Sequence, residues 1–336
     1  MSLAELPANL IDPTPQPLLA CVPESDVLAQ LLRDIRVERC LQYCFEPHGD
    51  WVVDASPAPF RPPGSVSFHI VVEGQVWIDL RERQFTADAG DVVIVPRGAH
   101  HFIGAGTDGR LLSPGDDLPP PPWPALPRVT YALPRAPRHR LLCGFLQARV
   151  LDFQPLLAAL PEVMLARPSR DDRDWLGPAV NRLVREIDEP TPGGMTLVAR
   201  LSEIVFIELL RRQMLQARAA SAGWLAALGD PVLQRALHAL HAQPEQAWTQ
   251  PSLAQAIGVS KTVLCEHFQR VLAMSPMRYL REWRLYLASA ELADSELSVQ
   301  RVAERAGYGT EAAFNRAFTR HYGTPPATWR RAQAAA

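Results

Sequence analysis

Three side chains in the first half of the chain could bind a metal ion or line a ligand site: His69, His101 and Cys143. Imidazole nitrogen and thiolate sulfur are ligands that zinc and copper accept, and a metal site needs three or four of them in one place. We therefore expect a zinc or copper site if the fold brings these three together. Histidines that bind no metal commonly bond internally or line an effector pocket, and this alternative stays open.

The cysteines indicate a second chemistry, thiol oxidation. A thiol beside an imidazolium or a metal has a lowered pKa, so Cys143 is a candidate redox residue if it lies next to the histidines. Cys40 and Cys44 are too far apart for an easy disulfide in an extended strand and close only in a helix, so either could pair with a third cysteine. Inert buried thiols are the alternative for all three.

Phosphate binding is the third chemistry, and the charge distribution places it in the last third of the chain. The 336 residues have a formal net charge of −2. From residue 231 onward there are twelve basic and eight acidic residues, a charge of +4, which leaves −6 for the remainder. Because an excess of basic residues suits a phosphate backbone, we expect the C-terminal third to bind nucleic acid.

The overall composition fits a globular protein with two domains. Hydrophobic residues make up 47% of the chain and charged residues 21%. No apolar run approaches the roughly 20 residues of a membrane span, and residues 1–17 lack the basic start and apolar core of a secretory signal. The expected location is the cytoplasm, where thiols stay reduced.

The candidate histidines lie in a segment typical of antiparallel β-structure. Short apolar runs at 65–72, 75–80 and 91–95 alternate with glycine and proline turns, which predicts a sandwich or barrel. The proline-rich stretch 112–137 is expected to leave the sheet and cross the surface, and 141–146 to form one more buried strand.

Helical spacing begins after residue 153. Residues 175–187 and 195–217 carry apolar side chains three and four positions apart, with a break at 190–194. The second of these helices has a broad apolar face, which either closes the preceding domain or pairs with a second subunit.

The C-terminal third contains a short helix, a glycine turn and a capped second helix, which is the order of a helix-turn-helix. Residues 253–257 form the first helix, and Gly258 begins the turn. Ser260 is a favourable N-cap for a helix that runs to about Leu272.

The same order follows a second time. Ser298 caps the first helix, Gly307 begins the turn, and Thr310 caps a helix that runs to Tyr322. Apolar spacing over 277–292 predicts a rigid spacer helix between the two units. Two such units on one chain could enter adjacent major grooves, roughly 34 Å apart on one face of DNA.

Two strings in this region carry a resemblance to a known family, SLAQAIGVSKTVLCEHFQRVLAMSPMRYLREWRL and SVQRVAERAGYGTEAAFNRAFTRHYGTPPATWR. Their glycine turns, their aromatic pair, the proline after the last helix and the closing Trp329-Arg330 fall in register. The run 252–330 therefore resembles the DNA-binding domain of the AraC/XylS regulators. The resemblance implies that Phe268, Phe314 and Phe318 are core residues.

The resemblance also implies which side chains face the DNA bases: Thr262, Cys265 and Glu266 in the first unit, and Glu311, Ala312, Asn315 and Arg316 in the second. It places Arg320 near a phosphate. Arginine is common in the family where Glu266 stands here, and because a carboxylate repels phosphate, direct reading by the first helix is the weaker expectation. Lys261, the only lysine, is expected to contact phosphate, with a solvated surface lysine as the alternative.

The segment with the histidines resembles a cupin domain. The string GDVVIVPRGAHH at 90–101 resembles the second cupin motif, and Phe68-His69 followed by Glu73-Gly74 resembles part of the first, although the full His-x-His pair is missing. Together with Cys143 and its neighbours, these strings make 27–165 similar to the cupin sensor domain of one branch of AraC-type regulators, the RclR-like branch that responds to reactive chlorine.

These observations predict an α+β chain in three parts. They are a cupin-like antiparallel β-barrel sensor domain at 25–165, a helical connector or dimerisation region at 166–228, and an all-α domain with two helix-turn-helix motifs at 229–333. The predicted protein is a sequence-specific transcription regulator that binds double-stranded operator DNA as a homodimer. Its cupin-like domain is expected to sense a small-molecule, metal or redox signal, and RNA polymerase is a further expected contact.

Two other functions stay open at this point. A metal-dependent cupin enzyme with an accessory DNA-binding module would need a complete ligand set, and the missing His-x-His pair counts against it. A barrel that only holds two subunits together would bind no effector. We expect no catalytic residue, and no cofactor other than zinc or copper at the three residues named first.

Overall fold

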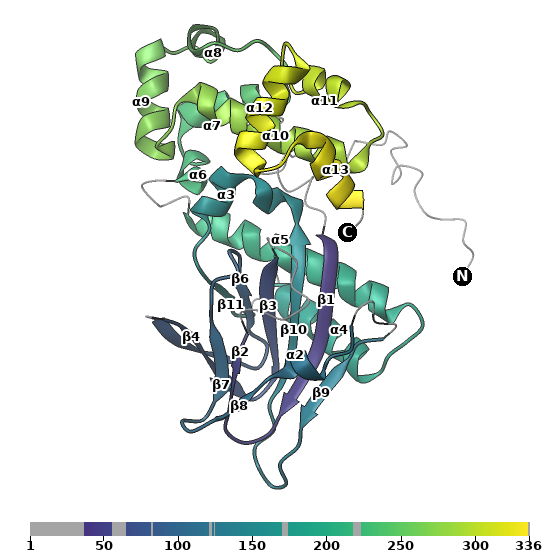
Figure 1. The fold of residues 1–336 in the computed structure, drawn as a ribbon. Helices are drawn as coiled ribbons and strands as arrows, with labels where there is room; N and C mark the ends of the chain where they lie inside the picture. Colours follow the sequence, from purple (N-terminus) through teal and green to yellow (C-terminus); the bar gives the residue numbers. More distant parts are fainter. Residues whose placement is uncertain are drawn as a thin grey trace, which may run out of the picture.

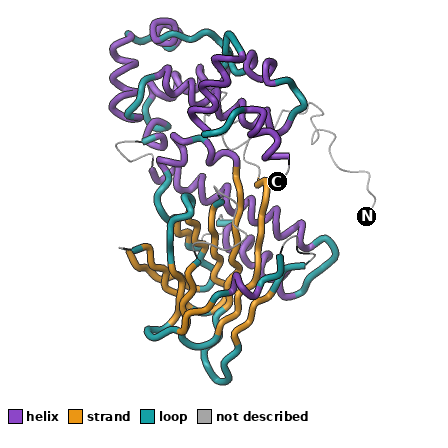
Figure 2. Tube along the Cα trace, in the orientation of Figure 1, coloured by secondary structure: helices purple, strands orange, loops and turns teal. Residues whose placement is uncertain are grey.

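The protein was analysed as a computed structural model that describes residues 37–55, 65–81, 83–120, 123, 125–169, 174–217 and 223–334. Figure 1 shows a lobe of short helices from the C-terminal third above a lobe of strands, with the long helix α5 (Gly194–Ala217) running across the strands. Figure 2 shows the same division by secondary structure. No helix in the described part of the chain is long and apolar enough to span a membrane.

Six strands form the larger sheet, in the order β11-β6-β3-β10-β1-β9. Their bounds are β1 (Val37–Pro47), β3 (Val66–Glu73), β6 (Val92–Val95), β9 (Arg128–Tyr131), β10 (Arg140–Ala148) and β11 (Met164–Ala166). Neighbouring strands are antiparallel except β1 and β9, which are parallel. The predicted buried strand at 141–146 is confirmed as part of β10, at the centre of this sheet.

Five strands form the second sheet, in the order β5-β4-β7-β2-β8. Their bounds are β2 (Trp51–Asp54), β4 (Gln75–Leu80), β5 (Arg83–Asp88), β7 (Phe102–Ala105) and β8 (Arg110–Leu112). Side chains of both sheets, among them Trp51, Val71 and Ile78, share one apolar interior. The predicted fold class is confirmed with one correction, because the described strands make two open sheets and not one closed barrel.

Helices cover the outer face of the larger sheet. Helix α4 (Leu176–Asp188) packs on α5, and the α5 side chains Val205 and Phe206 meet Phe68 and Ile70 of β3. Strand β3 is therefore covered on both faces, which explains why every residue from Val66 to Val71 is buried. The apolar face of α5 was predicted either to close the preceding domain or to pair with a second subunit, and in this structure it closes the domain.

The stretch predicted to cross the surface returns to the sheet once. It contains the short helix α2 (Pro114–Asp117) and then β9, which pairs with the edge of β1 from Cys44 to Pro47. The prediction is therefore wrong for 128–131, because an edge position needs only one hydrogen-bonded side and tolerates the prolines that flank it.

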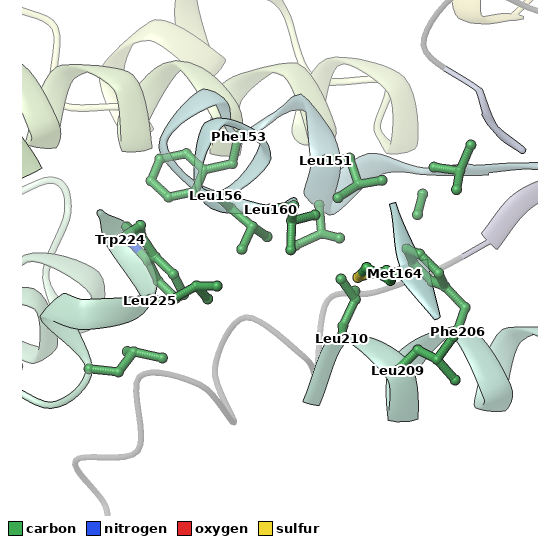
Figure 3. Close-up of a cluster of buried hydrophobic side chains, with 14 of the residues drawn as sticks. Leu151, Phe153, Leu156, Leu160, Met164, Phe206, Leu209, Leu210, Trp224 and Leu225 are labelled. Carbon is green, nitrogen blue, oxygen red and sulfur yellow. The ribbon is translucent and has the colours of Figure 1, made fainter. Parts of the chain in front are cut away.

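Residues 149–159 and helix α6 form the contact between the two lobes. Strand β10 continues directly into the 3₁₀ turn η1 (Arg149–Asp152) and helix α3 (Gln154–Ala159). Helix α6 (Trp224–Ala227) then packs against both α3 and the C-terminal lobe. Figure 3 shows Phe153, Leu156 and Trp224 in one continuous apolar cluster that extends to Phe206 of α5.

Seven helices of the C-terminal lobe follow α6 in the described residues: α7 (Pro231–Ala242), α8 (Gln250–Ala256), α9 (Lys261–Leu272), α10 (Pro276–Asp294), α11 (Val299–Arg305), α12 (Glu311–Tyr322) and α13 (Pro326–Ala334). The predicted N-caps are confirmed, since Ser260, Ser298 and Thr310 each accept a hydrogen bond from the backbone N–H three residues on. Gly258 and Gly307 both have positive φ, the conformation that the two turns require. We refer to α8–α9 as the first unit and to α11–α12 as the second unit.

Candidate DNA-binding surface and buried histidine cluster

The first unit exposes one side of α9. Leu264 and Phe268 are fully buried beneath the helix, whereas Lys261, Thr262 and Glu266 are exposed on its other side. Cys265, the remaining predicted base-facing residue of this helix, is partly exposed. The structure therefore gathers the predicted contact residues of the first unit on one accessible helix face.

The second unit repeats this arrangement on α12. Phe314 and Phe318 are fully buried, which confirms them as core residues together with Phe268 of the first unit. The predicted contact residues lie on the accessible side, with Glu311, Ala312, Arg316 and Arg320 exposed and Asn315 partly exposed. Within the described part of the chain, Arg316 has no ion-pair partner, so its guanidinium is available to an external acceptor.

Arg284 of α10 hydrogen-bonds to backbone carbonyls next to both units. Its guanidinium donates to the carbonyl oxygens of Pro244 and Gln246, which precede the first unit, at 2.6 and 2.8 Å. It also reaches the carbonyl oxygen of Gly307, in the turn of the second unit, at 3.4 Å. This side chain therefore links the loop before the first unit and the turn of the second unit to α10, which also packs against α9 and α12.

Asp230, the N-cap of α7, holds the C-terminal half of α9 in place. The carboxylate caps α7 by accepting from the N–H groups of Val232 and Leu233, and it also binds His267 and Arg270 of α9 at 2.7 and 3.0 Å. Burial acts to raise the pKa of Asp230, but these hydrogen bonds outweigh it and hold the pKa below its ordinary value. The position of α9 therefore depends on the start of α7 as well as on its own core.

The three candidate ligand residues lie next to one another inside the sandwich. His69 on β3 lies between the other two, with its Nδ1 at 3.2 Å from the Cys143 sulfur on β10 and its Nε2 at 3.0 Å from the His101 Nε2. His101 Nδ1 lies 2.7 Å from the Ala99 carbonyl oxygen. All three side chains are buried, and a Tyr43 hydroxyl from β1 hydrogen-bonds the sulfur. We call the chain from Tyr43 through Cys143, His69 and His101 to Ala99 the histidine relay.

The positions of the protons in the relay follow from the Ala99 carbonyl at one end. Since a carbonyl only accepts, His101 carries its proton on Nδ1, and its Nε2 accepts from His69 Nε2–H. His69 Nδ1 is then the acceptor for the Cys143 thiol. Burial, followed by the nearby His101, lowers the pKa of His69 well below its ordinary value, which keeps this ring neutral.

This geometry contradicts the predicted three-ligand metal site. His69 directs one ring nitrogen at Cys143 and the other at His101, so the two partners lie on opposite sides of its ring and cannot ligate the same ion with it. Among the described residues no group of three histidine, cysteine or acidic side chains is placed to hold a metal. The three residues lie together, but as a hydrogen-bonded chain and not as a ligand set.

The thiols also differ from the redox prediction. Burial raises the pKa of Cys143, and it raises the pKa of Cys44 to about 12, so neither thiol is activated. Cys44 packs on the helix-covered face of the sheet and Cys143 in the sandwich interior, which excludes a disulfide between them. Cys40 lies in β1, opposite Leu146, so the helical spacing that would bring it close to Cys44 is absent.

Sequence reasoning missed residues that surround the relay and the junction between the lobes. Tyr43 follows no recognisable motif, and only its alternation within β1 places it in the interior. Arg97 lies inside the motif-like string at 90–101, but nothing in the string shows what its side chain binds. Phe153 and Arg149 meet partners that lie 70 or more residues away along the chain, so no local pattern marks them.

Comparison with protein families divides the chain as its two lobes do. The family model described as cupin matches residues 26–215, and the one described as a helix-turn-helix domain matches residues 253–332. The cupin match alone covers more than half of the chain.

Curated relatives extend over both regions. The HTH-type transcriptional regulator AlkR of Acinetobacter baylyi is 27% identical over 311 residues, 91% of this chain and 99% of that protein. The RCS-specific HTH-type transcriptional activator RclR of Escherichia coli is 27% identical over 216 residues, 61% of this chain and 75% of that protein. Among solved structures, the DNA-binding domain of AdpA in complex with a target DNA is 29% identical, with a TM-score of 0.30, over 32% of this chain and 95% of that one.

Proposed function

From the premise that the chain belongs to the cupin family and is an AraC-type transcriptional regulator, we propose that its cupin domain senses an effector and controls how the two helix-turn-helix units bind operator DNA. The chain is a regulator and not an enzyme, which removes the cupin-enzyme alternative. The observation that carries the proposal is the pair of exposed helix faces, α9 and α12, on two helices that pack against the same spacer helix α10.

The second unit is the stronger base reader in this proposal. Arg316 is exposed and unpaired within the described residues, and an arginine in the major groove can donate two hydrogen bonds to guanine. Asn315 beside it suits adenine, and Arg320 one turn further suits a phosphate. In the first unit Lys261 offers a phosphate contact, while the carboxylate of Glu266 can accept a hydrogen bond from cytosine but repels phosphate.

The sensing role rests on the interior of the cupin domain. Three strands and the loop before β7 meet at the histidine relay, so a change in any of its hydrogen bonds alters contacts between the two sheets. Burial raises the pKa of Cys143, which argues against oxidation of this thiol as the signal, so we propose a small-molecule effector instead.

The remaining parts of the proposal follow from the class of protein. We propose domains at 25–165, 166–228 and 229–333; within these ranges residues 25–36, 56–64, 82, 121–122, 124, 170–173 and 218–222 lie outside the described residues. A homodimer would use the side of α5 that the sheet leaves open, where Ile204 is 46% exposed. The regulator would act in the cytoplasm, with RNA polymerase as a further contact.

The test starts by selecting DNA fragments from a random library with the purified full-length protein. Arg316→Ala should weaken binding to the selected DNA by about 1–3 kcal/mol and change binding to random DNA much less. An equal loss on both would make Arg316 a phosphate contact. Failure of the wild-type protein to enrich any sequence would contradict the proposed function.

A further inference from the structure

We propose that Arg97 and Phe153 couple the histidine relay to the first unit, so that the cupin domain controls α9 while the second unit serves as a constitutive DNA anchor. This inference rests on the proposed function and adds the route by which the regulation travels. The route consists of two branches that leave the relay separately and meet at helix α3.

The first branch runs through the loop that ends in His101. Arg97 lies four residues before His101, in the turn after β6, and its side chain is exposed. Its guanidinium donates to the carbonyl oxygens of Ala158 and Leu160 at 3.0 and 2.6 Å. Both acceptors lie at the C-terminal end of α3, where a cation is also favoured by the helix dipole. The loop that positions one end of the relay therefore also holds α3.

The second branch runs along β10. Cys143 is on this strand, and the strand leads without a gap through η1 to Phe153, which begins α3. A shift of β10 at the relay is therefore passed along a hydrogen-bonded strand to the same helix that Arg97 holds. Figure 3 shows where this strand ends, with Phe153 and Leu156 beside Trp224.

Phe153 inserts into an aromatic cage that belongs to the C-terminal lobe. Its ring makes edge contacts with Trp224 of α6 and with Tyr279 and Trp283 of α10, with ring centroids 5.2 to 6.5 Å apart. Tyr286 closes the remaining side at 5.7 Å. With 1% of its surface exposed, Phe153 gives any displacement of α3 a direct route to α6 and α10.

From the cage the route reaches α9. The N–H of Gly223, which precedes Trp224, donates to the Val271 carbonyl near the end of α9 at 2.7 Å. The Trp224 indole donates to the Tyr279 hydroxyl, and the Tyr279 ring packs on Phe268 of α9. All of these side chains belong to one apolar cluster that runs without interruption from the cupin domain into the first unit.

The second unit is joined to the cupin domain in a different way. Val302, Phe314 and Phe318 belong to a separate cluster that includes no buried residue of the cupin domain among those described. The contacts there are polar: Arg149 makes a two-pronged pair with Asp294 at the end of α10, and Asp152 lies near Tyr322. In this pair Asp294 is exposed and Arg149 is partly buried, and such a pair resists displacement less than a packed core does. Helix α10 borders both units, but only α9 also packs against α6 among the contacts of the described residues, so a movement of α3 should affect α9 more than α12.

The test compares amide hydrogen exchange in the full-length wild-type protein and in Arg97→Ala. Arg97 is exposed, so its loss should leave the fold intact while releasing the end of α3. We expect exchange in α3 and α9 to rise about tenfold and exchange in α12 to stay within about twofold. Arg97→Lys should give an intermediate effect, and Arg83→Ala, an exposed arginine on β5, should give none.

Two results would overturn the coupling. If α3 exchanges faster but α9 does not, Arg97 only caps its own helix; if α12 rises as much as α9, the two units are not separately connected. Phe153→Leu, which keeps the apolar contact, should also speed exchange in α9, and Phe45→Leu, a comparable change in the sandwich interior, should not. Lack of an effect on α9 from Phe153→Leu counts against the second branch.

A double-mutant cycle asks whether the relay uses this route. His69→Gln should raise exchange in α9 on its own and add much less in an Arg97→Ala background, because the two changes break one path. Full additivity would contradict the shared path. Binding of the wild-type protein to its selected DNA separates the two proposals, because a protein that binds no DNA refutes the proposed function, whereas a protein that binds DNA but shows no change in α9 refutes only the coupling.

Discussion

The two helix-turn-helix units are built alike and packed differently. Each has a glycine with positive φ in its turn, a Ser or Thr cap on its second helix, and phenylalanine beneath that helix. Phe268 of the first unit nevertheless belongs to an apolar cluster that continues to Phe206 in the cupin-domain helix α5, whereas Phe318 belongs to a cluster confined to the end of the chain.

This difference shows that the helix-turn-helix motif alone does not determine how a unit packs against the rest of the protein. Local sequence makes both units competent to enter a groove, but only packing outside the motif determines whether another domain can influence them. In our proposal, joining only one unit to the core of the cupin domain gives the protein one stable DNA contact and one adjustable contact.

The largest expected effect comes from removing the two core rings. Phe268→Ala and Phe318→Ala should each lower the free energy of unfolding by about 3–5 kcal/mol, because each leaves a cavity in a fully packed core. The comparison predicts where the damage spreads: Phe268→Ala should loosen α3 and α6 as well as α9, and Phe318→Ala only the helices of the second unit. Denaturation curves and hydrogen exchange measure both, and equal spreading in the two variants would erase the distinction.

The next largest effect is a loss of folding stability at acid pH, caused by the buried rings of His69 and His241. Burial lowers the pKa of His69 and lowers that of His241, in α7, to about 3, so both rings stay neutral in the folded protein. The unfolded chain takes up these protons below about pH 6.5, so the free energy of unfolding should fall by up to about 1.4 kcal/mol per pH unit for each ring as the pH drops toward 5. His69→Gln or His241→Gln should each remove one such contribution. An unchanged slope in both variants would show that the rings are not buried as neutral groups.

A smaller effect concerns the DNA contact of the first unit. Glu266→Arg should raise non-specific affinity and steepen the salt dependence by about one phosphate equivalent, because an exposed carboxylate on α9 is replaced by a cation. Glu296→Arg, at an exposed site between α10 and α11, is the matched control and should change the slope less. If both variants behave alike, α9 does not lie against DNA.

The smallest effect is expected from mild oxidation. Cys44 and Cys143 are buried with raised pKa values, so hydrogen peroxide should change DNA affinity by the same small amount in Cys44→Ser, in Cys143→Ser and in wild type. Cys265 is partly exposed on α9, and any loss of affinity should disappear in Cys265→Ser. A response that Cys143→Ser alone abolishes would restore the interior thiol as a redox sensor.

Much of the C-terminal lobe could be predicted because its determinants are local. Ser260 and Thr310 bond to backbone only three residues away, and the spacing of Phe314 and Phe318 places both on one helix face. Such short-range patterns are present in the sequence itself, so the caps, the turns and the core of both units were predicted correctly.

The cupin domain was predicted less completely because its determinants are distant. Motif positions named His69, His101 and Cys143 as candidates but left open whether they meet. The direction of each ring nitrogen depends on strand register, and this decides between a metal site and a relay. Arg97 binds carbonyls more than 60 residues away, and the open sheets depend on which edges pair. No local pattern carries that information.

Footprinting on the selected operator tests the central claim most directly, namely that both exposed helices bind DNA from one rigid spacer. The wild-type protein should protect two segments on one face of the duplex, about one helical turn apart. Thr262→Ala should weaken protection of one segment, and Asn315→Ala that of the other. A single protected segment that only Asn315→Ala affects would contradict the claim, because the first unit would then have no place on the DNA.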